Sequence, residues 1–182
     1  MAAGTVGVIY EDTRQQIHSG DKHKDKHAWF ALHDVKVVRK KLDEGDYQTE
    51  GSNVTVDTKQ HMDELAANLT RDHARFAREC DRAKNRGFRL VVLVEEAIDP
   101  WEWTNSRCRK CPVRVRLCCH PRQRGEACGR YGTAKPAQGN VLAKTIKTMT
   151  KDHGAIFDFC ARSDTGRRIC EWLGVEYDRT VE

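Results

Sequence analysis

Apolar and polar positions along the chain predict four strands. The β-branched run Thr5–Tyr10 indicates a buried strand, and Val35–Leu42 indicates a second. Asn53–Lys59 indicates a third strand, and the turn residues of "TEGSN" join it to the segment before it as a hairpin. Phe88–Glu96 is apolar enough for a strand buried on both faces.

Between the third and fourth strands the apolar period becomes helical. Apolar residues recur at steps of three, four and seven over Met62–Arg86, which predicts one amphipathic helix, and Gly87 supplies its C-terminal stop. His27–Val35 indicates a short helix, and the polar stretch His18–His27, with three histidines, indicates a solvated loop rather than a metal site. Strands, a long helix and a buried strand together predict an α/β fold with a mixed sheet.

Composition restricts the class of protein. Charged residues make up 32% of the 182-residue chain, and the mean hydropathy is −0.74. The longest apolar run, Leu90–Val94, is far too short to span a bilayer, and the N-terminus lacks the pattern of a signal peptide. We therefore expect a cytoplasmic protein with no membrane role, whose eight cysteines stay reduced.

Positive charge is concentrated in the segment from Arg107 to Arg130, which carries a net charge of +7 against +5 for the whole chain. Its eight basic residues are Arg107, Arg109, Lys110, Arg114, Arg116, Arg122, Arg124 and Arg130. A dense patch of one sign is the electrostatic footprint of a polyanion, most often nucleic acid. DNA is the expected partner, and a solvated charged loop is the alternative.

The third strand ends in a carboxylate and an ammonium group. Side chains alternate along a strand, so Asp57 and Lys59 point to one side, and the hairpin can bring Asp46 close to Asp57. Carboxylates in this order suit Mg²⁺ or Mn²⁺ in a phosphodiesterase, with the lysine orienting or deprotonating water or neutralising charge on the phosphorane. The alternative is an exposed ion pair worth about 0–1 kcal/mol.

Three short motifs carry a resemblance. "IYEDTRQ", "EGDY" and "VDTKQHMDEL", over about residues 5–96, resemble the nuclease domain of the XPF-type structure-specific endonucleases, with patterns V-D-x-R-E, G-D-Y/F and E-R-K-x-x-x-D. The resemblance implies a restriction-endonuclease-like core of the PD-(D/E)XK superfamily, Mg²⁺ or Mn²⁺ dependence, cutting of branched or flapped DNA, and a homodimer. Composition along the chain indicates three parts: a nuclease core (1–100), a Cys/Arg-rich insertion or zinc knuckle (101–138) and a C-terminal helical part that completes the domain (139–182).

The same resemblance assigns roles to single residues. Asp12, Asp46 and Asp57 are the expected metal-binding acids and Lys59 the catalytic lysine, with Arg14 and Asp63 in support or touching phosphate. Two departures stand out: Gln15 replaces the glutamate of V-D-x-R-E, for which Glu11 would compensate, and Asp57 replaces the glutamate of E-R-K. The C-terminal part lacks a helix-hairpin-helix repeat, which weakens the branched-DNA expectation.

The insertion holds a cysteine cluster whose C-x-x-C pair could begin a structural zinc site. The preferred ligands are Cys108, Cys111, Cys119 and Cys128, with Cys118 or His120 as substitutes. Free thiols in a basic loop are the alternative. We expect the remaining three cysteines to pack in apolar surroundings; they are Cys80, Cys160 and Cys170.

Three functions therefore compete. A metal-dependent DNA endonuclease is favoured, since three linked motifs surround the Asp57–Lys59 pair. A catalytically inactive nucleic-acid-binding module of the same fold comes second, with Gln15 as its sign. A zinc-stabilised interaction protein comes third.

Overall fold

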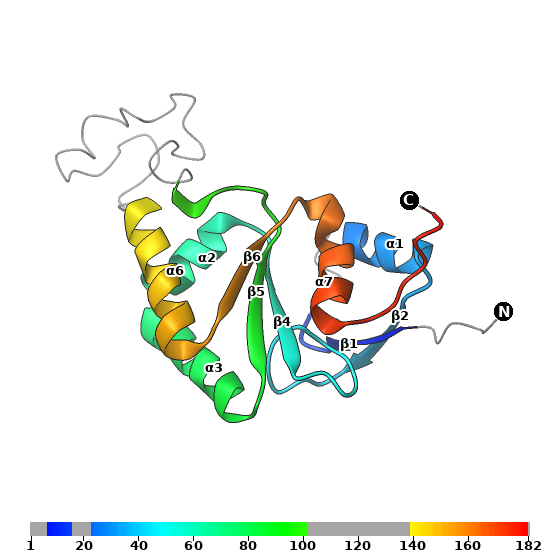
Figure 1. Ribbon diagram of the computed structural model, residues 1–182, viewed down its shortest axis with the longest axis horizontal. Coiled ribbons are helices and arrows are strands. Elements are labelled where there is room, and N and C mark those ends of the chain that lie inside the picture. The colour runs from blue at the N-terminus through cyan, green and yellow to red at the C-terminus, as the bar shows by residue number, and fades with distance from the viewer. Residues whose placement is uncertain (1–6, 16–22, 102–138, 182) are drawn as a thin grey trace, which may run out of the picture.

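A six-stranded mixed sheet lies at the centre of the computed structural model, which describes residues 7–15, 23–101 and 139–181 (Figure 1). Its strands follow the order β2-β1-β3-β4-β5-β6. They are β1 (Val8–Asp12), β2 (Lys36–Lys40), β3 (Tyr47–Gln48), β4 (Val54–Lys59), β5 (Arg89–Val94) and β6 (Ile156–Phe159). Only β3 is antiparallel to its neighbours, β1 and β4. The carboxyl ends of the other five strands therefore meet at one edge of the sheet.

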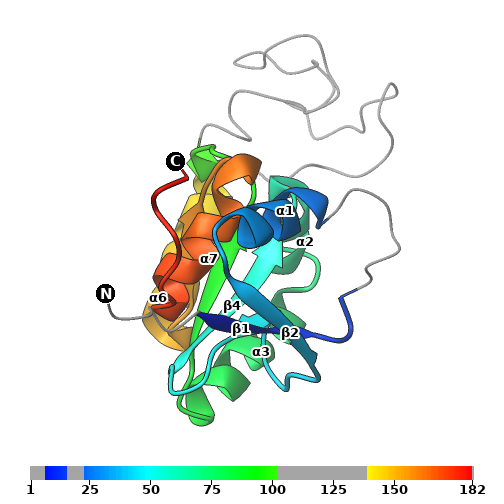
Figure 2. The ribbon, with the colours of Figure 1, turned by 90° about the vertical axis from the view of Figure 1, so that its right-hand side faces the viewer.

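Helices cover both faces of this sheet (Figures 1 and 2). One face carries α2 (Met62–Leu69), α3 (His73–Asn85) and α6 (Gly139–His153). The other carries α1 (Lys24–Leu32) and α7 (Thr165–Leu173), with a 3₁₀ turn at Arg162–Asp164 before α7. None of the described helices is both long and apolar enough to cross a membrane.

Strand β5 contributes side chains to both hydrophobic cores, one on each face of the sheet. Its side chains alternate, so Val92 and Val94 pack toward α2, α3 and α6, whereas Val91 and Leu93 pack toward α1 and α7. All four are fully buried, which confirms the prediction of a strand covered on both faces. A further strand, β6, pairs parallel to β5.

The predicted single helix over Met62–Arg86 is wrong, since two helices meet at Thr70–Asp72. Thr70 has a non-helical backbone, and its hydroxyl donates 2.6 Å to Ala66 O, a local bond that competes with helix continuation. The apolar pattern concealed the break because its step of seven, Leu69 to Phe76, falls across it. Gly87 ends α3 at φ +83°, as predicted.

Two further expectations near the N-terminus need correction. Strand β1 runs to Asp12 rather than ending at Tyr10, because its register with β2 pairs Glu11 and Asp12 with Arg39 and Lys40. The expected loop at His18–His27 contains the first turn of α1, which begins at Lys24. The basic segment Arg107–Arg130, with its predicted zinc ligands, lies outside the described residues.

Candidate active site

The "EGDY" turn holds Asp46, one of the three predicted metal-binding acids, in place. Asp46 N donates to Val56 O, and Asp12 N donates to Asp46 O, both at 2.8 Å, so this residue joins β4 to β1. The amide and hydroxyl of Thr58 each donate to Asp46 Oδ2 at 2.8 Å. Asp46 is thus held at the edge where β1 and β4 end.

Glycine is required just before this acid. Gly45 has φ +65°, a left-handed conformation that side chains disfavour. A Cβ there would lie 2.3 Å from Thr55 Oγ1 and 3.0 Å from Val56 O. The glycine of the motif therefore serves close packing of the turn against β4.

Asp57 and Lys59 form a buried ion pair rather than the exposed pair of the alternative prediction. Lys59 Nζ lies 2.6 Å from Asp57 Oδ2, and the two side chains are 15% and 9% exposed. Burial raises the pKa of Asp57 to about 7 against the opposing charge of Lys59, and repulsion from Asp46 and Glu79 adds to the rise. Burial lowers the pKa of Lys59, but Asp57 outweighs it, so the net shift is upward and the ammonium is retained.

The first motif places Asp12 at the end of β1, 2% exposed. Its Oδ2 accepts from Arg14 Nε at 2.5 Å, and Arg14 Nη2 donates to Leu42 O at 2.8 Å. The Arg14 side chain is 63% exposed, so its charge remains accessible from solvent. Asp12 and Arg14, both residues of the first motif, therefore form an ion pair.

The three predicted acids line one cavity of about 280 Å³. Its walls are Asp12, Arg14, Gln15, Asp43, Glu44, Gly45, Asp46, Asp57, Glu79 and Arg82. Asp63, in the first turn of α2, and Lys59 are not among these lining residues. The structure thus brings Asp12, Asp46 and Asp57 to one cavity, with Lys59 joined to it through Asp57.

Sequence reasoning missed four of the lining residues, which are Asp43, Glu44, Glu79 and Arg82. Glu44 is buried, and it accepts from Arg82 Nε of α3 at 2.9 Å. Glu79 lies one helical turn before Arg82 on the same helix. Glu44 directly precedes the "GDY" motif, which was a usable signal, but nothing in the sequence of α3 indicates that it approaches β4.

Glu11 lies on the opposite face of the sheet from Asp12, because neighbouring strand residues point to opposite sides. It is 1% exposed, accepts from Tyr47 Oη at 2.9 Å and lies 2.8 Å from His27 Nε2. It does not line the cavity, so the structure does not place it where it could compensate for Gln15. A buried ion pair, Lys26–Glu95, lies on the same face as Glu11.

The expected metal, Mg²⁺ or Mn²⁺, needs oxygen ligands from the site. Within residues 7–15, 23–101 and 139–181, no three His, Cys, Asp or Glu side chains are grouped closely enough to hold a metal ion by themselves. Mg²⁺, however, keeps several waters and binds through one or two carboxylates together with substrate phosphate. The lining carboxylates meet that smaller requirement. Glu44 is one of them, and its Oε2 is buried with no hydrogen-bond partner among the described residues.

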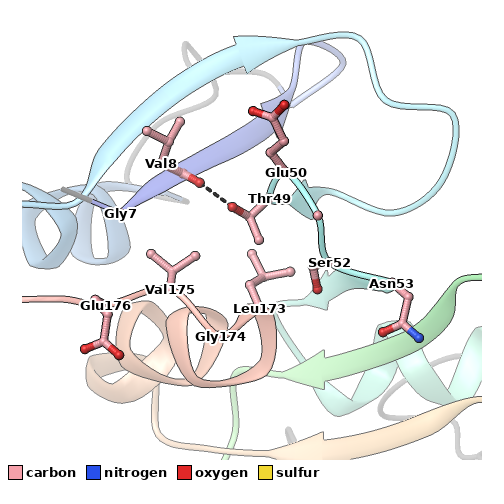
Figure 3. Close-up of a pocket in the computed structure, with 11 residues that line it drawn as sticks. Gly7, Val8, Thr49, Glu50, Ser52, Asn53, Leu173, Gly174, Val175 and Glu176 are labelled. Carbon is pink, nitrogen blue, oxygen red and sulfur yellow. Dashed lines mark hydrogen bonds between the residues drawn. The ribbon is translucent and has the colours of Figure 1, made fainter. Parts of the chain in front are cut away.

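A larger cavity of about 700 Å³ lies at the other end of the sheet, where β1 and β4 begin. Figure 3 shows it between the β3–β4 turn and the end of α7, with Thr49 donating to Val8 O at 2.7 Å. Backbone and small side chains dominate its walls, and among the described residues that line it only Glu50 and Glu176 are charged. It lacks the paired charges that mark the Asp57 site.

Comparison with known proteins supports the fold. No protein-family model matches the chain, and no curated protein matches it. Among solved structures, the chain is similar to XPF from Aeropyrum pernix in complex with DNA, with a TM-score of 0.55 and 16% sequence identity. The similarity covers 92% of this chain and 64% of the XPF chain. It confirms the predicted fold class, a restriction-endonuclease-like mixed sheet flanked by helices.

Proposed function

We propose that this protein is a metal-dependent DNA endonuclease that hydrolyses phosphodiester bonds. The observation that carries the proposal is the buried Asp57–Lys59 pair at the end of β4, beside a cavity lined by Asp12 and Asp46. Hydrolytic metal sites use carboxylates to hold the cation and a nearby positive group to neutralise the phosphorane. The similarity of the fold to a DNA-bound XPF supports DNA as the substrate.

Each site residue has a role in this proposal. Asp46 and Asp57 would hold Mg²⁺ or Mn²⁺, with Asp12 as the third acid, and the metal would polarise the phosphate and supply a nucleophilic water. Lys59 keeps its proton beside Asp57, so it acts as a cation at the phosphate rather than as the base that deprotonates water. Arg14, anchored on Asp12 and largely exposed, is suited to contact a neighbouring phosphate.

In the hydrolytic step, a water oxygen forms a new bond to phosphorus and the bond from phosphorus to one sugar oxygen breaks. The departing sugar oxygen takes up a proton, and the water loses one. Burial of Asp57 and Lys59 strengthens their fields, because little water screens charges at that depth. Branched or flapped DNA is the preferred substrate class in this proposal, and a homodimer and a structural zinc knuckle at residues 101–138 belong to it as further proposals.

A catalytically inactive DNA-binding module is the second candidate. Gln15 lines the cavity at the position where the resembling motif has an acid, and the described acids form no ready-made group of three ligands. The two candidates differ in whether DNA is cut, and they share its binding.

Cleavage assays separate the candidates. Purified protein is incubated with labelled flap, junction and linear DNA and either Mg²⁺ or Mn²⁺, beside Asp57→Asn and Lys59→Met. The endonuclease predicts products from the wild type that both variants lose, while DNA binding persists. Equal products from all three proteins would show a contaminating nuclease, and no products despite salt-sensitive binding would favour the inactive module.

A further inference from the structure

We propose that Glu79 of α3 is a cation ligand of this site and supplies the acid that Gln15 lacks. The inference rests on the proposed endonuclease function and adds a residue from outside the three motifs. Glu79 and Gln15 line the same cavity as Asp57. The acid would therefore reach the site from a helix instead of from the segment after β1.

The helical geometry of α3 turns Glu79 toward the strand ends. Phe76, Cys80 and Ala83 bury one stripe of the helix in the core. Glu79 and Arg82, spaced by three, occupy the adjacent stripe and both line the cavity. Since the core residues fix the rotation of the helix, the backbone of Glu79 stays on the stripe that borders the cavity.

An ion pair holds this stripe of α3 against the motif turn. Arg82 Nε donates to Glu44 Oε1 at 2.9 Å, and Arg86 Nη1 lies 3.6 Å from the same oxygen. Glu44 directly precedes Gly45 and Asp46 in the chain. The Arg82–Glu44 ion pair therefore connects α3 to the turn that holds Asp46. Glu79 is thereby placed relative to Asp46 by short-range contacts.

The acidic residues that line the cavity outnumber its basic residues. Glu79 is partly buried, with its side chain 23% exposed, and it interacts with two arginines of its own helix, Arg75 at 3.9 Å and Arg82. Independently, Glu44 is a lining residue of the same cavity, and its Oε2 is buried with no hydrogen-bond partner among the described residues, an arrangement that costs free energy unless a ligand satisfies it.

The test measures Mn²⁺ binding by calorimetry and DNA cleavage in parallel for wild type, Glu79→Gln, Gln15→Glu/Glu79→Gln and Asp57→Asn. Glu79→Gln should weaken Mn²⁺ binding by about tenfold or more and abolish cleavage, with an unchanged circular dichroism spectrum. The double variant should regain Mn²⁺ affinity, because the new acid enters the same cavity. Glu176→Gln is the matched control, since it makes the same change of charge at the larger cavity at the other end of the sheet, and it should bind Mn²⁺ as the wild type does.

The outcomes separate this inference from the proposed function. If Glu79→Gln binds Mn²⁺ and cuts DNA like the wild type while Asp57→Asn does neither, Glu79 is not a ligand and the endonuclease stands. If Glu79→Gln loses affinity but Gln15→Glu does not restore any of it, the replacement of Gln15 by Glu79 is refuted. If Asp57→Asn cuts normally, or if the wild type binds no Mn²⁺, both proposals fail.

Discussion

Burial of Asp57 predicts that the metal-free protein loses stability as pH rises from 5 to 8. A carboxyl with a pKa of 3.8 in the unfolded chain and about 7 in the fold keeps its proton longer when folded. Its stabilising contribution is complete below pH 3.8 and is lost progressively as pH rises to 7 and above. Repulsion from Asp46 and Glu79 adds to the effect of burial.

The expected magnitude follows from the two pKa values. Between pH 5 and pH 8, this one group lowers the free energy of unfolding by up to about 2.5 kcal/mol. For a chain of this size the loss corresponds to about 5–10 °C in melting temperature. Asp57→Asn removes the titrating group, so the variant should lose that much less over the same range. Lys59→Met removes the opposing charge and should steepen the loss.

Urea unfolding followed by circular dichroism, in EDTA at pH 5, 6, 7 and 8, measures these slopes. Other groups also titrate in this range, so the relevant quantity is the difference between the wild-type and Asp57→Asn slopes. Added Mg²⁺ should restore wild-type stability at pH 8, since the cation binds the ionised carboxylate that the fold otherwise disfavours. Parallel slopes for the wild type and Asp57→Asn would refute the argument.

Three further predictions concern the stability of the fold and the burial of its cysteines. Glu95→Gln leaves Lys26 charged and buried without its partner, so it should lower the free energy of unfolding in urea by about 3–5 kcal/mol. Adding Lys26→Met should recover much of that loss. Equal losses in the single and double variants would contradict this. Gly45→Ala should cost about 2 kcal/mol or more, from the positive φ and the contact with Thr55, and a wild-type melting temperature would show that the turn relaxes freely. Burial raises the pKa of three thiols to about 11–12, so native iodoacetamide labelling at pH 8 with peptide mapping should leave them unmodified until urea is added; they are Cys80, Cys160 and Cys170.

The sequence alone determined the types of most elements and the main motif residues, because both are local properties. Period-two and helical apolar patterns depend on neighbours a few positions apart, so β4 and β5 were predicted close to their observed places, whereas α1 begins and ends three residues before the predicted helix. Side-chain alternation put Asp57 and Lys59 on one side, and a hairpin predicted that Asp46 approaches them. The three cysteines expected to pack are all buried.

Tertiary structure decided what depends on sheet order and on packing between distant segments. The β1 register sent Glu11 to the α1 face and Asp12 to the cavity, which no count of charges could show. The packing of α3 brought Glu79 and Arg82 to the end of β4, although no motif links these residues. Burial turned Asp57–Lys59 from an ordinary surface ion pair into a strongly perturbed site, since desolvation is a property of the whole fold.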